Sequence, residues 1–248
     1  MKILVSSLIA AFCISVSGAM AGFFDDIKGL LGESGSTSGI QRDVLSNQEV
    51  AGGLKEALGK GAQLAVSELG KEDGFFSNTD VKIPVPKKLR QVEKGLRALG
   101  KDDLADQFIL SMNRAAEQAV PLAADTFKDA ISNMTIDDAM GILKGGETSG
   151  TDYLRKSSSG TLRQSFRPIV DKAIDEVDAT RSYQEFVGNT SALGNLMGSK
   201  SSLDLTDYVT DKALDGVFHM IAQEEAKIRE NPAARTSDLL KKVFGSVD

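Results

Sequence analysis

Apolar side chains recur every three or four residues along most of this chain, which is the spacing of one face of an α-helix. The first clear helix begins after Ser46, which forms a capping box with Glu49, and ends at Gly70 as a C-terminal cap. Its core-facing positions are all apolar: Leu54, Leu58, Ala62, Ala65 and Leu69. A neighbouring stripe of small residues predicts close packing against another helix: Gly53, Ala57, Gly61 and Ala65.

The same spacing predicts further helices, which glycine and proline separate. They cover residues 87–99, 102–119, 121–134, 136–143, 151–187, 206–229 and 237–244. The segment 151–187 is expected to form two helical parts with a kink before Pro168, and the two prolines within 81–86 predict an extended connector. No stretch alternates as a β-strand does. The pattern therefore predicts an all-α fold, a single helical globular domain over residues 40–248.

The first residues have a different pattern, which is that of a secretory signal peptide. Lys2 supplies a positive charge, and residues 3–16 form an apolar run. Ala19 and Ala21 then provide the small side chains that signal peptidase requires, so cleavage is expected between Ala21 and Gly22. The apolar run is shorter than the roughly 20 residues that cross a membrane, and we expect export to the periplasm without an anchor.

Composition and charge add two restrictions. Residues 22–39, which follow the signal peptide of residues 1–21, are rich in Gly, Ser and Thr and predict a flexible tether. The single cysteine, Cys13, lies in the signal peptide, so the mature domain has no disulfide to stabilise it. The formal net charge of −6 argues against nucleic acid as a partner, because duplex binding depends on neutralising phosphates.

Three segments carry a resemblance to a known family. They are VKIPVP at residues 81–86, SMNRAAEQAVPLAADTFKDAISNMTIDDA at 111–139 and DLTDYVTDKALDGVFHMIAQEEAKIRENPAARTSDLLKKVFG at 204–245. With these segments the chain resembles DUF4197, a bacterial family of unknown function, over roughly residues 41–245. The resemblance implies an exported helical protein of Gram-negative-type bacteria. It brings no established activity, cofactor or catalytic residue.

The helix predicted at residues 87–99 has two distinct faces. Apolar side chains occupy one of them: Leu89, Val92, Leu96 and Leu99. Cationic side chains repeat with the same spacing on another: Lys87, Arg90, Lys94 and Arg97. Such a helix can lie on anionic lipid or capture an acidic partner. The alternative, which the sequence favours, is a core-facing helix whose solvated side is basic.

An acidic stripe marks the start of the long helix near the C-terminus: Asp204, Asp207, Asp211 and Asp215. Three interpretations are open, which are a solvated or salt-bridged face, a surface for a partner protein, and a cation site. The sequence lacks the D-x-D-x-D-G spacing of a calcium loop, which argues against the third. The basic and acidic stripes could also face each other, within one chain or between two copies, and association between copies would then be sensitive to salt.

Two smaller clusters could carry chemistry. Arg114 and Glu117 lie three residues apart among apolar side chains. A carboxylate in such surroundings can serve as a general acid, as in enzymes that cleave glycan strands, or can simply form a neutralising pair at a helix interface. Arg163 belongs with Arg155 and Arg167 to a run of cations near serine hydroxyls, which can bind an anion or face solvent.

Missing motifs restrict the function further. The chain has one histidine, His219, and none of the motifs G-x-S-x-G, G-x-x-x-x-G-K-[ST] or G-x-G-x-x-G, so we predict no metal site and no cofactor. The sequence favours an exported, periplasmic helical protein that binds a partner protein, or itself, without catalysis. Two alternatives stay open, a carboxylate-dependent enzyme of the envelope or cell wall that uses Glu117, and a peripheral binder of anionic membranes. The second would use residues 87–99, or the apolar residues Phe23, Phe24, Leu30 and Leu31 near the mature N-terminus.

Overall fold

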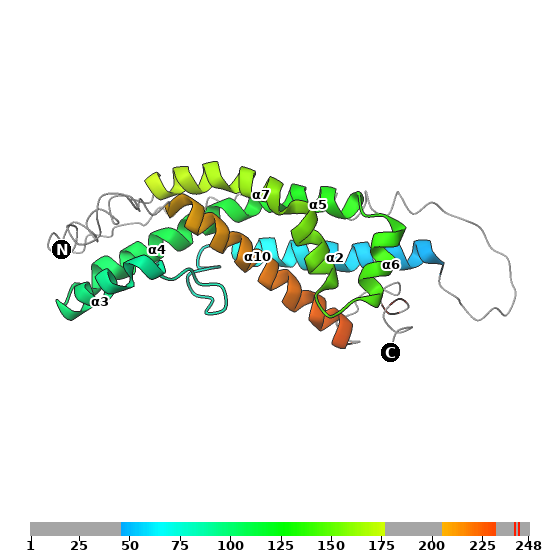
Figure 1. The fold of residues 1–248 in the computed structure, drawn as a ribbon, viewed down its shortest axis with the longest axis horizontal. Helices are drawn as coiled ribbons and strands as arrows, with labels where there is room; N and C mark the ends of the chain where they lie inside the picture. The colour runs from blue at the N-terminus through cyan, green and yellow to red at the C-terminus, as the bar shows by residue number, and fades with distance from the viewer. Residues whose placement is uncertain (1–45, 177–204, 232–240, 242, 244–248) are drawn as a thin grey trace, which may run out of the picture. The chain divides into compact units, whose positions relative to one another are not determined.

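The fold is known from a computed structural model, which describes residues 46–176, 205–231, 241 and 243. These residues form helices and connecting turns and contain no strand, so the predicted all-α fold is confirmed. The α-helices are α2 (Asn47–Leu69), α3 (Arg90–Ala98), α4 (Asp102–Ala119), α5 (Ala123–Ser132), α6 (Ile136–Lys144), α7 (Ser149–Glu176) and α10 (Leu205–Glu230) (Figure 1). Two 3-10 turns join them, η2 (Lys87–Leu89) and η3 (Val120–Leu122). The predicted signal peptide, the tether, Asp204 and most of the segment 237–244 lie outside the described residues.

Helix α2 begins and packs as its sequence predicts. The Ser46 hydroxyl accepts a hydrogen bond from the Glu49 amide, and the Glu49 carboxylate accepts one from the Ser46 amide, at 3.2 and 2.8 Å. The small-residue stripe faces α10, since a Cβ atom at Gly61 would lie 3.5 Å from the Cβ atom of Glu224. Small side chains therefore let these two helices approach closely.

Gly70 ends α2 for a reason that differs from the expected one. Its φ is −82°, within the range of ordinary residues, so a left-handed cap does not explain the glycine. A Cβ atom at this position would lie 2.8 Å from the Val66 carbonyl oxygen and 3.1 Å from Cγ of Pro121. The close approach of η3 to the end of α2 is what requires a residue without a side chain.

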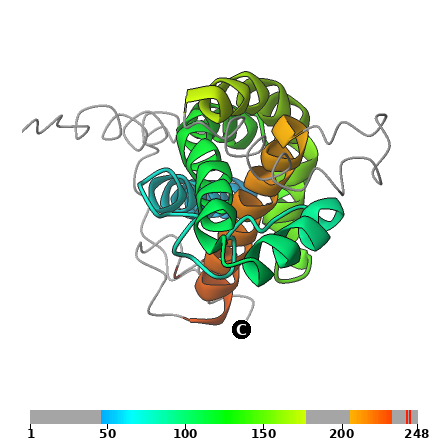
Figure 2. The same cartoon turned by 90° about the vertical axis from the view of Figure 1, so that its left-hand side faces the viewer.

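The core lies between α2, α4, α5, α7 and α10. Helix α10 contacts α2, α4 and α7, and α7 contacts α4 and α5 as well, so these helices share one interior (Figure 2). Five phenylalanines are almost fully buried there: Phe75, Phe108, Phe127, Phe166 and Phe218. Phe127 and Phe218 meet edge to face with ring centroids 5.7 Å apart. Within the described ranges, no helix combines the length and the apolar composition that a membrane span requires.

Two helix predictions require correction. Helix α7 continues through Pro168 without a break, so residues 151–176 are not two helical segments. Pro168 and Gln164 are both exposed, and solvent can therefore replace the hydrogen bond that proline cannot donate. Leu99, which was predicted to face the core, is 69% exposed because it lies past the end of α3, at the turn that Gly100 makes with a φ of +70°.

The capping box of α6 gives a stability prediction. The Thr135 hydroxyl accepts a hydrogen bond from the Asp138 amide at 3.1 Å, and the Asp138 carboxylate accepts one from the Thr135 amide at 3.0 Å. We expect Thr135→Ala to lower the free energy of unfolding by about 1 kcal/mol, because it leaves a main-chain N–H of the first turn without a partner. Urea denaturation measures this, and Thr161→Ala, at an exposed position inside α7, serves as the control that should cost nothing.

The same box predicts a dependence on pH. Hydrogen bonds from the side chain and main chain of Thr135 lower the pKa of Asp138 below its ordinary value of 3.8. A lowered folded-state pKa stabilises the fold above the unfolded-state value, and this contribution is lost as the pH falls through the folded-state value. The stability difference between wild type and Thr135→Ala should therefore shrink well below pH 3.8. An equal difference at neutral and acid pH would contradict this account.

Candidate functional site

The side chains of Lys87, Arg90 and Lys94 form a cationic face on η2 and α3. All three are exposed, and none of them makes a hydrogen bond or an ion pair within the residues that the structure describes. The face stays open because α3 packs on α4 through its opposite side, where Val92 and Leu96 are buried (Figure 1). This cationic face, which consists of Lys87, Arg90 and Lys94, is the candidate binding surface.

Arg97 was predicted to belong to this face, and the structure places it among carboxylates instead. Its guanidinium lies 2.8 Å from Asp106, 3.3 Å from Asp102 and 3.3 Å from Glu93. The hydrogen bond with Asp106 is the main cause that raises the pKa of Arg97 above its ordinary range. Arg97 therefore joins the start of α4 to α3, and its charge is already neutralised.

A tyrosine of α10 lies beside the cationic face. The hydroxyl of Tyr208 donates a hydrogen bond of 2.9 Å to the main-chain carbonyl of Pro84, in the extended connector that leads into η2. Burial raises the pKa of Tyr208, and the nearby charge of Arg90 partly opposes this shift. Tyr208 thus holds the end of the connector in place, just before the cations Lys87 and Arg90.

The acidic stripe of α10 pairs with arginines of α7. Asp207 accepts a hydrogen bond from Arg167 at 2.9 Å, and Asp215 lies 3.4 Å from Arg155. Asp211 forms an ion pair with Arg163. The described part of the acidic stripe therefore contacts the second basic run and not the cationic face, and Arg163 is not available as an anion site.

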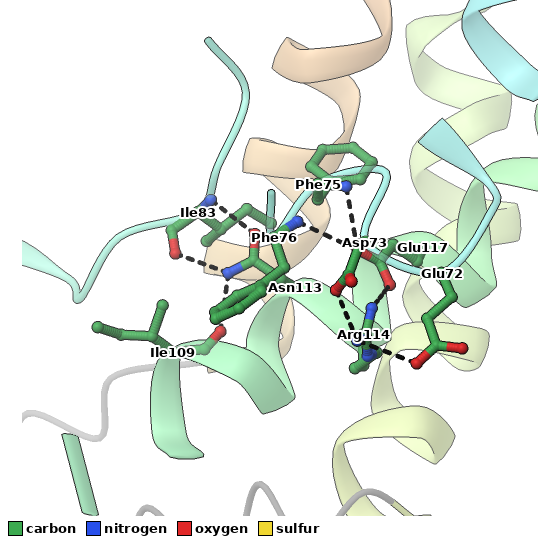
Figure 3. A network of polar contacts seen from close by, with 9 residues as sticks. All are labelled: Glu72, Asp73, Phe75, Phe76, Ile83, Ile109, Asn113, Arg114 and Glu117. Atoms are coloured by element: carbon green, nitrogen blue, oxygen red, sulfur yellow. Dashed lines mark hydrogen bonds and ion pairs between the residues drawn. The ribbon is translucent and has the colours of Figure 1, made fainter. Parts of the chain in front are cut away.

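Glu117 of α4 is buried, with 4% of its surface exposed, and its carboxylate binds the main chain. One oxygen, Oε1, accepts hydrogen bonds from the amides of Phe75 and Phe76 at 3.0 and 3.1 Å (Figure 3). The other, Oε2, accepts a 2.6 Å hydrogen bond from Arg114. These donors occupy both oxygens, so a substrate would have to displace the chain's own groups to reach Glu117.

Arg114 extends this network to the turn that follows α2. Its guanidinium donates to Asp73 at 2.7 Å and to Glu72 at 3.3 Å (Figure 3). Asp73 has a φ of +65°, which brings the turn back toward α4. A Cβ atom at Gly74 would clash with the carbonyl oxygens of Glu68 and Leu69. The Arg114–Glu117 pair therefore stabilises a tight turn, whereas the structural interpretation of this pair predicted a helix interface.

Asn113, one residue before Arg114, holds the connector further along. Its carbonyl oxygen accepts a hydrogen bond from the Ile83 amide at 2.8 Å, and its amide nitrogen donates to the Ile83 carbonyl at 3.0 Å (Figure 3). A second donor bond reaches the Ile109 carbonyl at 2.7 Å. Asn113 is fully buried, and α4 thus holds both the connector, through Asn113, and the turn after α2, through Glu117.

Glu225 of α10 is a second buried carboxylate, which the sequence analysis did not identify. It accepts hydrogen bonds from the amides of Gly150 and Thr151 at 2.9 and 2.7 Å, at the start of α7. Arg229 completes the set through a 2.9 Å bond to Glu225, and it also donates to the Ile142 carbonyl at 3.0 Å. The signal in the sequence was a carboxylate on the apolar stripe of a helix with an arginine four residues later.

A shallow pocket lies where Glu225 meets α2. Apolar residues supply most of its lining: Leu54, Ala57, Leu58, Gly61, Ile221 and Ile228. Its free space is close to that of one water molecule, which is far less than a metabolite needs. Across the described ranges, no three His, Cys, Asp or Glu side chains gather in a way that could hold a metal ion.

The fold and the site together define a class of protein, an all-α domain whose buried carboxylates bind its own main chain and whose described arginines all form ion pairs except Arg90 on α3. The chain belongs to the family DUF4197, a protein family of unknown function, which matches residues 44–245. The resemblance seen in the sequence is thereby confirmed. Comparison with curated proteins and with solved structures finds no significant match.

The Glu117 network gives a prediction that separates a structural role from a catalytic one. We expect Glu117→Gln to lower the free energy of unfolding by about 2 kcal/mol, because the amide loses the charge-assisted bond to Arg114 in a buried site. Chemical denaturation of the purified domain measures the loss. Glu68→Gln, which removes an exposed carboxylate paired with Lys71, should change stability by less than about 0.5 kcal/mol. Equal stabilities of Glu117→Gln and wild type would show that the network does not stabilise the turn.

Proposed function

We propose that this chain is an exported, periplasmic interaction protein that binds an acidic partner through the cationic face. The observation that carries the proposal is that Arg90 forms no ion pair within the described residues. Every other arginine of the described residues forms an ion pair with a carboxylate: Arg97, Arg114, Arg155, Arg163, Arg167 and Arg229. Arg90 makes no such pair, and Lys87 and Lys94 beside it make none. Charges that the chain does not neutralise are available to a partner.

Two features of the structure argue for binding rather than for catalysis. The carboxylate that best fitted a general acid, Glu117, accepts hydrogen bonds from two main-chain amides and Arg114. Glu225 is engaged in the same way with Gly150 and Thr151. Both carboxylates support the fold, and the charged groups that the proposal uses, which have no partner within the described part of the chain, lie on the surface in the cationic face.

Self-association through the two charged stripes is less well supported than binding of a different protein. Asp207, Asp211 and Asp215 already form ion pairs with α7. A second copy would have to break these pairs before its acidic stripe could meet a cationic face. Exchanging one set of exposed ion pairs for another gives little net free energy of association. The acidic groups are therefore expected from another protein.

Export can be tested directly. In a Gram-negative host we expect the protein in the periplasmic fraction, because Ala19 and Ala21 form a signal peptidase site. Its intact mass should be that of the chain that begins at Gly22. Ala21→Arg places a large charged side chain at the cleavage position and should leave the leader attached. Ala19→Ser keeps a small side chain and should be processed like wild type. Full-length protein in the cytosol would disprove the export part of the proposal.

Binding can be tested with polyglutamate as an acidic probe. The triple variant Lys87→Gln, Arg90→Gln and Lys94→Gln should weaken binding roughly tenfold to a hundredfold, since each surface charge pair contributes a few tenths to one kcal/mol. The control removes three exposed lysines elsewhere, with Lys71→Gln, Lys144→Gln and Lys156→Gln, and has the same net charge. Fluorescence anisotropy at low and physiological salt measures both. Equal weakening by the two triple variants would reduce the effect to net charge and contradict a specific face.

A further inference from the structure

The outer side of α3 carries more than its cations. Gly95 lies inside this helix, and a Cβ atom there would meet nothing within 4 Å. Glycine is unfavourable inside a helix compared with alanine, because it loses more conformational freedom on folding. No contact within the described chain accounts for this glycine, unlike Gly61, which lies against α10.

Gly95 belongs to a small apolar strip. Ala98 follows at the third position, and the amide of Leu99, just past the end of α3, still donates to the Gly95 carbonyl at 3.2 Å, so the three residues lie on one side. Ala98 is exposed, and Leu99 is the most exposed large apolar side chain of the described residues, at 69%. This apolar strip, which consists of Gly95, Ala98 and Leu99, borders the cationic face.

A small residue, an exposed leucine and a line of cations together match one kind of partner. Lys87, Arg90 and Lys94 are spaced by three and four residues, so their charges follow the axis of α3. An α-helix that lies along α3 repeats its own side chains with the same spacing. Acidic groups of that helix can meet the three cations while its apolar stripe covers Gly95, Ala98 and Leu99.

We propose that the cationic face and the apolar strip bind an amphipathic α-helix of another protein, with acidic side chains beside its apolar stripe. This inference rests on the proposed function and adds the form of the partner. Gly95 lets the two helix axes come close, as Gly61 does between α2 and α10. Charge complementarity sets the register, and Leu99 supplies the apolar contact.

The test uses the mature protein and two labelled peptides of about 18 residues. One carries Glu at positions i, i+3 and i+7 beside a leucine stripe, and the other is a scrambled peptide of equal composition. We expect the first to bind at least about tenfold more tightly in fluorescence anisotropy. If both peptides bind equally, the partner need not be a helix and this inference fails, while binding of polyglutamate would still support the proposed function.

Gly95 provides the sharper measurement, because its substitution should separate stability from binding. Gly95→Ala should raise the melting temperature by a few degrees, and its methyl group should weaken binding of the helical peptide roughly tenfold. Gly160→Ala in α7, where a Cβ atom also meets nothing within 4 Å, should raise the melting temperature without changing binding. Unchanged binding by Gly95→Ala would overturn the inference.

Leu99 completes the design and separates protein from lipid. Leu99→Ser should weaken binding of the helical peptide. Leu122→Ser, at an exposed leucine of η3, should leave this binding unchanged. Vesicles of phosphatidylglycerol and phosphatidylcholine are expected not to bind. If anionic vesicles bind and neither polyglutamate nor the helical peptide does, the surface recognises lipid, and both this inference and the acidic-protein proposal are wrong.

Discussion

Two buried carboxylates hold together the parts of this fold that helix periodicity alone cannot place. Glu117 and Glu225 each accept hydrogen bonds from two consecutive main-chain amides and from an arginine of their own helix. A buried amide without an acceptor is costly. The two carboxylates supply this acceptor, so the turn after α2 and the start of α7 can be buried against neighbouring helices. The same interactions engage Glu117, the carboxylate that the sequence offered as a general acid, with donors of the chain itself. The buried charges of this chain therefore serve to satisfy its own main chain.

The helices themselves were largely predictable, because local signals determine them. The capping box of Ser46, the stop at Gly70, and the helices predicted at 102–119 and 136–143 lie at or within a residue of their expected positions. Pro168 was misjudged because a helix tolerates a proline where the carbonyl that loses its N–H donor can accept from water instead, and this requires exposure. Exposure depends on neighbours that are distant in the sequence.

The site was less predictable for the same reason. Spacing identified the cations of α3 and the acids of α10, but not which charges would meet. Arg97 lost its place on the cationic face because the chain reverses at Gly100 and brings Asp102 and Asp106 beside it. Leu99 left the core through the same reversal. Glu225 was missed because its amide partners lie about 75 residues earlier in the chain. Patterns along one helix report its faces, and tertiary structure decides what each face contacts.

The pairing of Asn113 with Ile83 has a consequence for aggregation. Ile83 and Val85 are β-branched residues of the connector, which forms neither helix nor strand, and such a backbone can pair with a strand of a neighbouring molecule. The carboxamide of Asn113 binds both the N–H and the C=O of Ile83, as an adjacent strand would. A helix side chain thus occupies the edge that an incoming β-strand would need, and Pro84 and Pro86 lack the amide hydrogens to extend such a ladder.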